Sequence, residues 1–295
     1  MSVTIAGVDV SKPQKVLFPA TETPEVTKED LARYYAGIAT IMLPHVRGRP
    51  ISMQRFPDGI EGPSFYEKRV PRHFPDFVAT VQVRTADGPQ RQVMIEDEAT
   101  LVYLAQQACL TPHTWLSTAA DLDHPDQLIF DLDPTVPGLG AVRRATVMVG
   151  EVLDDLGLRT FLKTTGSRGY HVVVPLRPEA DFEAVRAFAR TVAEVLVRRA
   201  PDLLTLQSRK KKRGDRVLVD VQRNGYGQTA VPPYAVRARP GAPVAVPIRW
   251  DELSRIEPAG HTIRTINRRL AQVQDPWQVF SEHRQDLTRA RERQA

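Results

Sequence analysis

The stretch Leu128-Ile129-Phe130-Asp131-Leu132-Asp133-Pro134 decides how the centre of this chain folds. A short apolar run of this kind is typical of a buried strand. Because alternate strand residues share a face, Asp131 and Asp133 point together while Leu132 points into the core. Carboxylates placed side by side repel each other, and a bound divalent cation usually relieves this repulsion. The stretch therefore predicts a metal site. The alternative is that Asp-x-Asp-Pro only caps the following turn.

The segments on either side of this strand mix helices and strands, which predicts an α+β fold with a mixed sheet. We expect strands over 159–163, 170–175 and 216–221, and helices over 28–43, 141–156 and 182–200. Thr27 and Asp30 form a capping-box pattern ahead of the first of these helices. β-formers over 80–84 and 90–95 flank Asp87-Gly88 and predict a hairpin with its turn there. The polar tail 281–295 is expected to be a surface helix or a frayed end.

Composition limits the classes of protein to consider. The 295 residues correspond to one or two domains, and 42% hydrophobic with 25% charged residues is typical of a soluble folded protein. No apolar run approaches the roughly 18 residues that span a bilayer, and the first residues lack the apolar region of a signal peptide. We therefore expect a cytoplasmic protein without a membrane partner. Cys109 is the only cysteine, which excludes an internal disulfide and a Cys-cluster zinc site, and we expect it to be buried.

A third carboxylate lies in the apolar segment Val217-Leu218-Val219-Asp220-Val221. Alternation places Asp220 on the face opposite the three valines. An acid in so apolar a strand needs a partner. If this strand is a neighbour of Asp131 and Asp133, the three carboxylates could hold two metal ions roughly 3.5–4 Å apart, the arrangement that polymerases use.

Thr164-Thr165-Gly166-Ser167-Arg168-Gly169 connects two of the expected strands. Its glycines permit a tight turn whose backbone N–H groups can cradle a phosphate, with further donors from Ser167 and Arg168. The alternative is an ordinary glycine-containing hairpin. His171 would project near the same place and could hydrogen-bond a triphosphate, although a lone strand histidine is more often structural.

The positive charge of the chain is concentrated in one segment. The net charge is +5, and the excess gathers at Arg209, Lys210, Lys211, Lys212, Arg213 and Arg216. Clustered cations favour a polyanionic partner. The alternative is a solvated, flexible loop.

Taken together and in this order, the segments Phe130–Pro134, Thr164–His171 and Val219-Asp220 with Asn224 resemble the polymerase domain of bacterial DNA ligase D, which belongs to the archaeo-eukaryotic primase superfamily. The likeness runs from about Asp9 to Trp277. It also includes Lys15-Val16-Leu17-Phe18-Pro19, Thr27-Lys28, Gly48-Arg49-Pro50, Arg55 to Gly59, Phe65-Tyr66-Glu67-Lys68, His113 and Pro233-Tyr234 to Arg237.

The resemblance implies a fold and an activity. The implied fold is α+β, with mixed and antiparallel sheets flanked by helices and an RRM-like primase-polymerase core. One such domain would fill 1–295, with an N-terminal DNA- and 5′-phosphate-binding part over about 1–110, a catalytic core over about 111–245 and a C-terminal helical tail over about 246–295. The implied activity is template-directed nucleotidyl transfer that adds nucleotides, preferably ribonucleotides, at DNA gaps and broken ends by a two-metal mechanism. Non-homologous end joining, short gap filling and priming all remain open as pathways.

The resemblance also implies roles for residues at matching positions. Asp131, Asp133 and Asp220 would be the catalytic acids and would bind Mn²⁺, or Mg²⁺, as the cofactor. The implied nucleotide-binding residues are Thr165, Ser167, Arg168, His171, His113, Arg213 and Arg237. The implied DNA-binding residues are Lys15, Lys28, Arg55, Tyr66 and Lys68. Lys15 and Lys28 would hold a 5′-phosphate, and Tyr66 would stack on a template base.

Three positions depart from the family pattern. Gln54 stands where relatives often carry lysine, which removes one expected phosphate contact. Arg223 stands where glutamine is expected. Arg168 replaces a common lysine, which keeps the charge but changes its geometry.

The implied partners are DNA with 5′-phosphorylated gaps or breaks, ribonucleoside and deoxyribonucleoside triphosphates and, in end joining, Ku and a separate DNA ligase. The implied location is the cytoplasm, at the nucleoid. Relatives usually carry ligase and nuclease domains that this chain lacks, so it is expected to be a stand-alone polymerase or an excised domain. Two other functions stay open: a non-catalytic DNA-end-binding module, and a nucleotide-sugar glycosyltransferase, which also uses Asp-x-Asp with manganese but leaves the basic segment unexplained.

Overall fold

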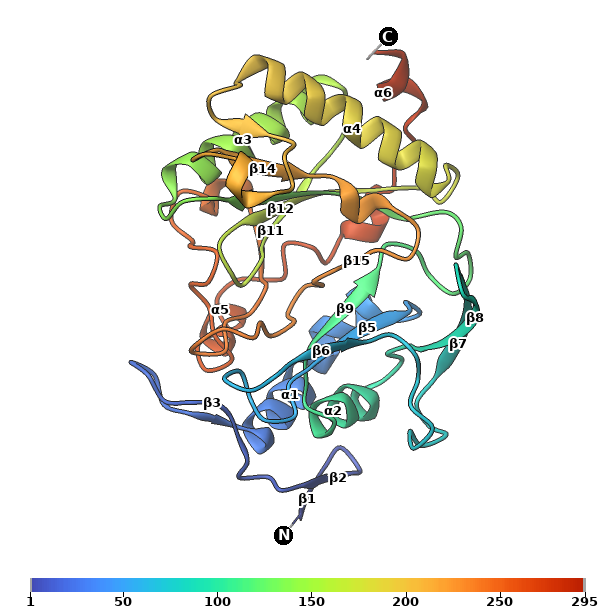
Figure 1. Ribbon diagram of the computed structural model, residues 1–295, viewed down its shortest axis with the longest axis vertical. Helices are drawn as coiled ribbons and strands as arrows, with labels where there is room; N and C mark the ends of the chain where they lie inside the picture. The colour runs from blue at the N-terminus through green and yellow to red at the C-terminus, as the bar shows by residue number, and fades with distance from the viewer. Residues whose placement is uncertain (1, 294–295) are drawn as a thin grey trace. The chain divides into compact units, whose positions relative to one another are not determined.

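The computed structural model describes residues 2–293, which form two compact units (Figure 1). The first unit takes in the described part of Met1–Ala120, together with Thr229–Ala245 and His261–Gln272. The second takes in Asp121–Gln228, Val246–Gly260 and the described part of Val273–Ala295. Helices and mainly antiparallel sheets occur in both units, so the expected α+β fold is confirmed.

The second unit is built on a six-stranded sheet in the order β13-β14-β10-β12-β11-β16. The strands are β10 (Gln127–Pro134), β11 (Phe161–Thr164), β12 (Tyr170–Pro175), β13 (Leu204–Thr205), β14 (Val217–Asp220) and β16 (Pro247–Ile248). The pairing of β13 with β14 is parallel, and the other pairings are antiparallel. The sheet is therefore mixed, and β10 lies inside it, where both of its edges are paired.

Two amphipathic helices, α3 (Gly140–Asp155) and α4 (Phe182–Arg199), pack against β10 and against each other (Figure 1). The apolar residues that recur at helical spacing along α4 are all buried: Phe182, Val185, Phe188, Val192 and Leu196. Asp181 begins this helix by accepting a hydrogen bond from the Ala184 N–H at 2.8 Å. Phe130 and Leu132 of β10 are fully buried. Alternation leaves Asp131 and Asp133 on the opposite face of the sheet.

The remainder of the second unit consists of short helices and connections. They are η1 (Lys210–Lys212), η2 (Gln222–Asn224), η3 (Trp250–Glu252), η4 (Phe280–His283) and α6 (Thr288–Glu292). Near the C-terminus, the Trp277 ring stacks on Phe280 with centroids 4.8 Å apart, and its Nε1 donates to the Leu162 carbonyl at 3.0 Å. The polar tail thus includes the short helix α6, while its last two residues, 294–295, lie outside the described part of the chain.

The first unit contains a four-stranded sheet in the order β15-β9-β5-β6 and three two-stranded ribbons. The four strands are β5 (Ile51–Arg55), β6 (Phe65–Glu67), β9 (Cys109–Trp115) and β15 (Thr229–Ala230). The ribbons pair β1 (Ser2–Ile5) with β2 (Val8–Ser11), β3 (Val16–Phe18) with β4 (Val26–Thr27), and β7 (Thr80–Thr85) with β8 (Gly88–Val93). Cys109 is buried, as expected.

The helices of the first unit are α1 (Lys28–Val46), α2 (Glu98–Gln106) and α5 (Ile266–Leu270). The capping box formed by Thr27 and Asp30 is confirmed, and α1 runs three residues further than the sequence predicted because Pro44 is accommodated within it. The expected hairpin is also confirmed. Its turn lies one residue earlier than expected, because Thr85 pairs directly with Gly88. Within 2–293, no helix has the length and apolarity needed to cross a membrane.

Candidate active site

The three predicted acids lie on adjacent strands of the second unit. In the pairing of β10 with β14, Asp131 stands directly opposite Asp220, and Asp133 stands opposite Leu218. Residues directly opposite in an antiparallel pair have Cβ atoms roughly 4.5–5.5 Å apart and point to the same face. The strand of Asp220 is therefore the neighbour that the sequence hypothesis required, and the two carboxylates stand side by side.

Asp131 is mostly buried, with 16% of its side chain exposed, and faces nitrogen atoms of two side chains. His171 Nε2 lies 3.4 Å from its Oδ1, and Arg223 Nε lies 3.6 Å from its Oδ2. Burial alone would raise the pKa of Asp131. The interactions with His171, Arg223 and Lys163 outweigh burial and hold this pKa well below its usual range. Asp131 is therefore ionised at neutral pH.

Asp220 has a different electrostatic environment. Its Oδ1 accepts a hydrogen bond from the Gln222 N–H at 2.8 Å. Burial raises the pKa of Asp220 against that hydrogen bond, and the negative charge on Asp131 raises it further. The Asp131–Asp220 pair is thus a site where an added cation would relieve repulsion.

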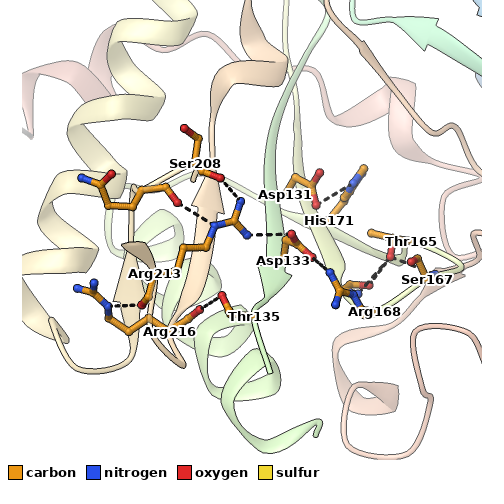
Figure 2. Close-up of polar contacts among 12 residues, drawn as sticks. Asp131, Asp133, Thr135, Thr165, Ser167, Arg168, His171, Ser208, Arg213 and Arg216 are labelled. Carbon is orange, nitrogen blue, oxygen red and sulfur yellow. Dashed lines mark hydrogen bonds and ion pairs between the residues drawn. The ribbon is translucent and has the colours of Figure 1, made fainter. Parts of the chain in front are cut away.

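Asp133 is held by two arginines (Figure 2). Arg213 Nη1 lies 3.0 Å from its Oδ2, and Arg168 Nη2 lies 3.3 Å from its Oδ1. Arg213 is buried and also donates to the carbonyls of Gln207 at 2.8 Å and Ser208 at 2.6 Å. Asp133 therefore connects the loop after β11 with the loop before β14.

The basic segment is anchored at its end and solvated along its length. Arg209, Lys210, Lys211 and Lys212 are exposed. Arg216 Nε donates to the Arg213 carbonyl at 2.7 Å, and Thr135 Oγ1 donates to the Arg216 carbonyl at 2.7 Å (Figure 2). The exposed cations consequently lie on a loop that is tied to the acids through Arg213.

The loop between β11 and β12 is held closely against β10. Thr165 organises it: its N–H and its Oγ1 both donate to the Gly169 carbonyl, at 3.0 Å and 2.9 Å, and Ser167 N–H donates to Oγ1 at 3.3 Å. Gly166 has a φ of +64°, which favours glycine. A Cβ on Gly169 would lie 1.8 Å from the Leu132 carbonyl oxygen, so this position accepts only glycine. The close approach holds the loop against β10, and Arg168 lies beside Asp133.

A buried histidine and a buried lysine extend the row of polar side chains across the sheet. His171 pairs with Asp131 on one side and with Lys163 on the other. Burial lowers the pKa of His171 to about 4, and the neighbouring Lys163 contributes in the same direction, so the imidazole is neutral at pH 7. Sequence reasoning missed Lys163, which is only 1% exposed. The available signal was a lysine within the apolar strand Phe161-Leu162-Lys163.

The remaining predicted residues belong to the first unit: Lys15, Lys28, Arg55, Tyr66, Lys68, His113 and Arg237. Tyr66 is 57% exposed, and its ring lies 5.5 Å from that of buried His113 on β9. Lys68 is exposed, and Arg237 is partly buried.

Lys15 and Lys28 lie close together where the chain enters α1. The Lys28 N–H donates to the Lys15 carbonyl at 2.8 Å, and Lys15 Nζ forms an ion pair with Asp58 at 2.8 Å. Lys28 is 7% exposed. Burial lowers its pKa, as do the charges of Lys15 and Lys12. A cluster of cations around one buried ammonium has the electrostatics of an anion site.

Arg55 makes its contacts within the protein. Its Nη1 forms an ion pair with Glu67 at 2.6 Å, and its Nε donates to the Gln107 carbonyl at 2.9 Å. These contacts tie β5 to β6 and to the residue after α2, which is a structural role in the described protein.

The donor set can be compared with the needs of a divalent cation. Hard cations such as Mn²⁺ and Mg²⁺ prefer carboxylate oxygens, and the raised pKa of Asp220 beside Asp131 fits such an ion. Asp133 is turned towards Arg213 and Arg168, and over residues 2–293 no group of three or more His, Cys, Asp or Glu side chains is arranged to hold a metal. The carboxylates are suitable ligands for a divalent cation. Asp131 and Asp220 already lie opposite each other, whereas Asp133 is paired with arginines.

Comparison with known proteins places this chain in a family. The chain is 34% identical over 294 residues to the multifunctional non-homologous end joining protein LigD of Pseudomonas aeruginosa, covering 98% of this chain and 34% of that protein. It is 31% identical over 276 residues to the bifunctional non-homologous end joining protein LigD of Bacillus subtilis, covering 92% of this chain and 44% of that protein. The chain thus spans between about a third and less than half of these relatives.

A solved structure agrees with the sequence comparisons. The polymerase domain from Mycobacterium tuberculosis Ligase D in complex with DNA matches with a TM-score of 0.85 and 30% identity, covering 94% of this chain and 99% of that one. Residues 27–277 match the family described as LigD, primase-polymerase domain. The chain therefore belongs to the LigD primase-polymerase domain family.

Proposed function

We propose that the chain is a template-directed nucleotidyltransferase that adds nucleotides, preferably ribonucleotides, to DNA at gaps and broken ends. The observation that carries this proposal is the register of β10 and β14, which sets Asp131 opposite Asp220 beside a glycine loop that has phosphate-binding chemistry. The names of the relatives, non-homologous end joining proteins, support end joining or short gap filling as the setting.

Asp131, Asp133 and Asp220 would hold Mn²⁺ or Mg²⁺ in this proposal. A bound pair of such ions supplies a clamp for the attacking and the leaving oxygen in nucleotidyl transfer. The low pKa of Asp131 keeps its carboxylate ionised and ready as a ligand. Asp133 would bind an ion after its carboxylate releases the ion pair with Arg213.

Residues around the acids would hold the triphosphate of the incoming nucleotide. Arg168 is 46% exposed and offers a planar set of donors suited to phosphate oxygens. Within the loop, the Ser167 N–H donates to Thr165 Oγ1, so we propose that the side chains of Thr165 and Ser167, rather than this N–H, contribute beside Arg168. Neutral His171 directs Nε2 towards Asp131 and has a buried Nδ1 without a hydrogen-bond partner. Arg213 would complete the set in this unit. His113 and Arg237, which belong to the first unit, are proposed separately as nucleotide-binding residues.

The first unit would bind the DNA. Lys15 and buried Lys28 form the proposed 5′-phosphate site, and exposed Tyr66 offers a ring on which a template base can stack. Lys68 would contact the phosphate backbone. In end joining, the proposed partners are Ku and a DNA ligase.

One observation favours a second candidate, a DNA-end-binding module without catalysis. Both oxygens of Asp133 are engaged by arginines, and an acid fixed in this way would not be free to bind an ion. The two candidates differ in one outcome, which is whether nucleotides are incorporated.

Primer extension on a gapped duplex with a 5′-phosphate tests the proposal. The wild type should incorporate nucleotides in the presence of Mn²⁺ and should stop when EDTA is added. Asp131→Ala and Asp220→Ala should abolish extension while DNA binding, measured by fluorescence anisotropy, persists. Extension by both variants at the wild-type rate would refute the assignment of the acids. DNA binding by a wild type that never extends the primer would establish the end-binding module instead.

A further inference from the structure

β10 extends beyond the strand that pairs with it on the β14 side. β14 ends at Asp220, opposite Asp131, so the preceding part of β10 has no strand partner along this edge. The backbone N–H and C=O groups of alternate strand residues point to the same neighbour. Those of Ile129, two residues before Asp131, therefore point to the place that a longer β14 would fill. Ile129 is buried, where unpaired backbone groups are strongly disfavoured.

The side chain of Asn224 fills that place. Its Oδ1 accepts the Ile129 N–H at 2.8 Å, and its Nδ2 donates to the Ile129 carbonyl at 2.8 Å. Nδ2 also donates to the Val221 carbonyl at 3.0 Å. Asn224 is 0% exposed. A carboxamide has one acceptor oxygen and two N–H donors, so this side chain reproduces the two hydrogen bonds that a further strand residue would make.

The turn that Asn224 closes carries two groups of the active site. η2 follows Asp220, whose carboxylate accepts the Gln222 N–H at 2.8 Å, and it ends at Asn224. Between them lies Arg223, whose Nε is 3.6 Å from Asp131. Fixing Asn224 to Ile129 therefore fixes the turn relative to the strand that holds Asp131 and Asp133.

We infer that Asn224 is a positioning residue for the metal-binding acids: its carboxamide locks η2 against β10 and so keeps Asp220 and Arg223 beside Asp131. This inference rests on the proposed function. The hydrogen bonds of the Asn224 carboxamide go to the backbone of Ile129 and Val221, so it acts on the acids through them. Groups that hold a ligand residue in place affect metal affinity as well as turnover.

The test compares Asn224→Ala and Asn224→Asp with the wild type. Asn224→Asp keeps the size of the side chain and an acceptor for the Ile129 N–H, but it lacks the two N–H donors. Leu153→Ala is the matched control, because Leu153 is fully buried in α3 of the same unit and lies outside the site. Binding of Mn²⁺ is measured by the electron paramagnetic resonance signal of the free ion, without nucleotide. The turnover number and the nucleotide KM are measured by gap filling, and DNA binding by anisotropy.

Both Asn224 variants should lose on the order of 10–100-fold in Mn²⁺ affinity and in kcat, with DNA affinity and nucleotide KM little changed. Leu153→Ala should lose thermal stability but keep the Mn²⁺ affinity of the wild type. Wild-type Mn²⁺ affinity in both Asn224 variants overturns the inference, as does an equal loss in Leu153→Ala. A wild type that neither binds Mn²⁺ nor extends a primer would instead show that the proposed function itself is wrong.

Discussion

Replacing Gly169 with alanine tests whether the glycine loop must approach β10 as closely as the structure shows. The added Cβ would lie 1.8 Å from the Leu132 carbonyl oxygen, whereas carbon–oxygen contacts normally begin near 3.3 Å, so the two backbones must separate by roughly 1.5 Å. The obstacle is backbone rather than a flexible side chain, and β10 is held on both edges by β12 and β14. The loop with Ser167 and Arg168 must therefore move away from the acids.

A misplacement of about 1 Å in a catalytic arrangement can lower the rate about 100-fold, and overpacking typically costs about 1–3 kcal/mol of stability. We expect Gly169→Ala to lower kcat in gap filling at least about 100-fold and the free energy of unfolding in urea by about 1–3 kcal/mol. Gly140→Ala is the control, because nothing lies within 4 Å of a Cβ there and the backbone needs no positive φ. Wild-type turnover in Gly169→Ala would contradict the described packing, and so would an equal loss in Gly140→Ala.

Three further predictions concern residues of the first unit. Lys28→Ala should weaken binding to 5′-phosphorylated DNA about 10–100-fold in anisotropy titrations, since a charge-assisted hydrogen bond is lost, and the same loss on 5′-hydroxyl DNA would argue against a phosphate site. Burial raises the pKa of the Cys109 thiol to about 12, so the thiol should react with Ellman's reagent at pH 8 only after denaturation. Rapid labelling of the folded protein would show that the surroundings of Cys109 open to solvent. Arg55→Ala should lower the free energy of unfolding by about 1–3 kcal/mol, because Glu67 loses its ion-pair partner. Tyr66→Ala, at an exposed position, should change it by less than about 0.5 kcal/mol, and equal effects of the two variants in thermal melts would contradict the prediction.

The local elements could be predicted from the sequence because their signals are local. The apolar periodicity of α4 gives its inner face, the pattern of Thr27 and Asp30 gives the start of α1, and alternation gives the common face of Asp131 and Asp133. Strand β9 shows the limit of such signals. All of its residues are buried although Pro112 lies within it. β15 pairs only with Thr114 and Trp115, so β9 has no strand partner at Pro112 on that edge, where proline is tolerated.

The finer geometry of the site depends on contacts between residues distant in sequence. The pairing of Lys163 with His171 follows from the register of β11 and β12, which no single segment specifies. Arg213 reaches Asp133 from 80 positions away, so a basic segment alone gave no reason to assign that contact. The roles implied for Lys15, Lys28, Tyr66 and Lys68 stay predictions, because they concern a ligand and not contacts within the chain.

The chain's repeated passage from one unit to the other limits how the protein can be divided. The sheet that carries the acids obtains its edge strand β16 from Val246–Gly260 and the ring of Trp277 from a still later stretch. A fragment ending at Gln228 would keep every predicted acid and yet leave one edge of β11 unpaired. Neither unit can be excised with a single cut. Truncation to a minimal domain should therefore yield aggregation-prone fragments, and a linker inserted at a loop tip such as Ala86-Asp87 is a better way to attach a tag or a fusion partner.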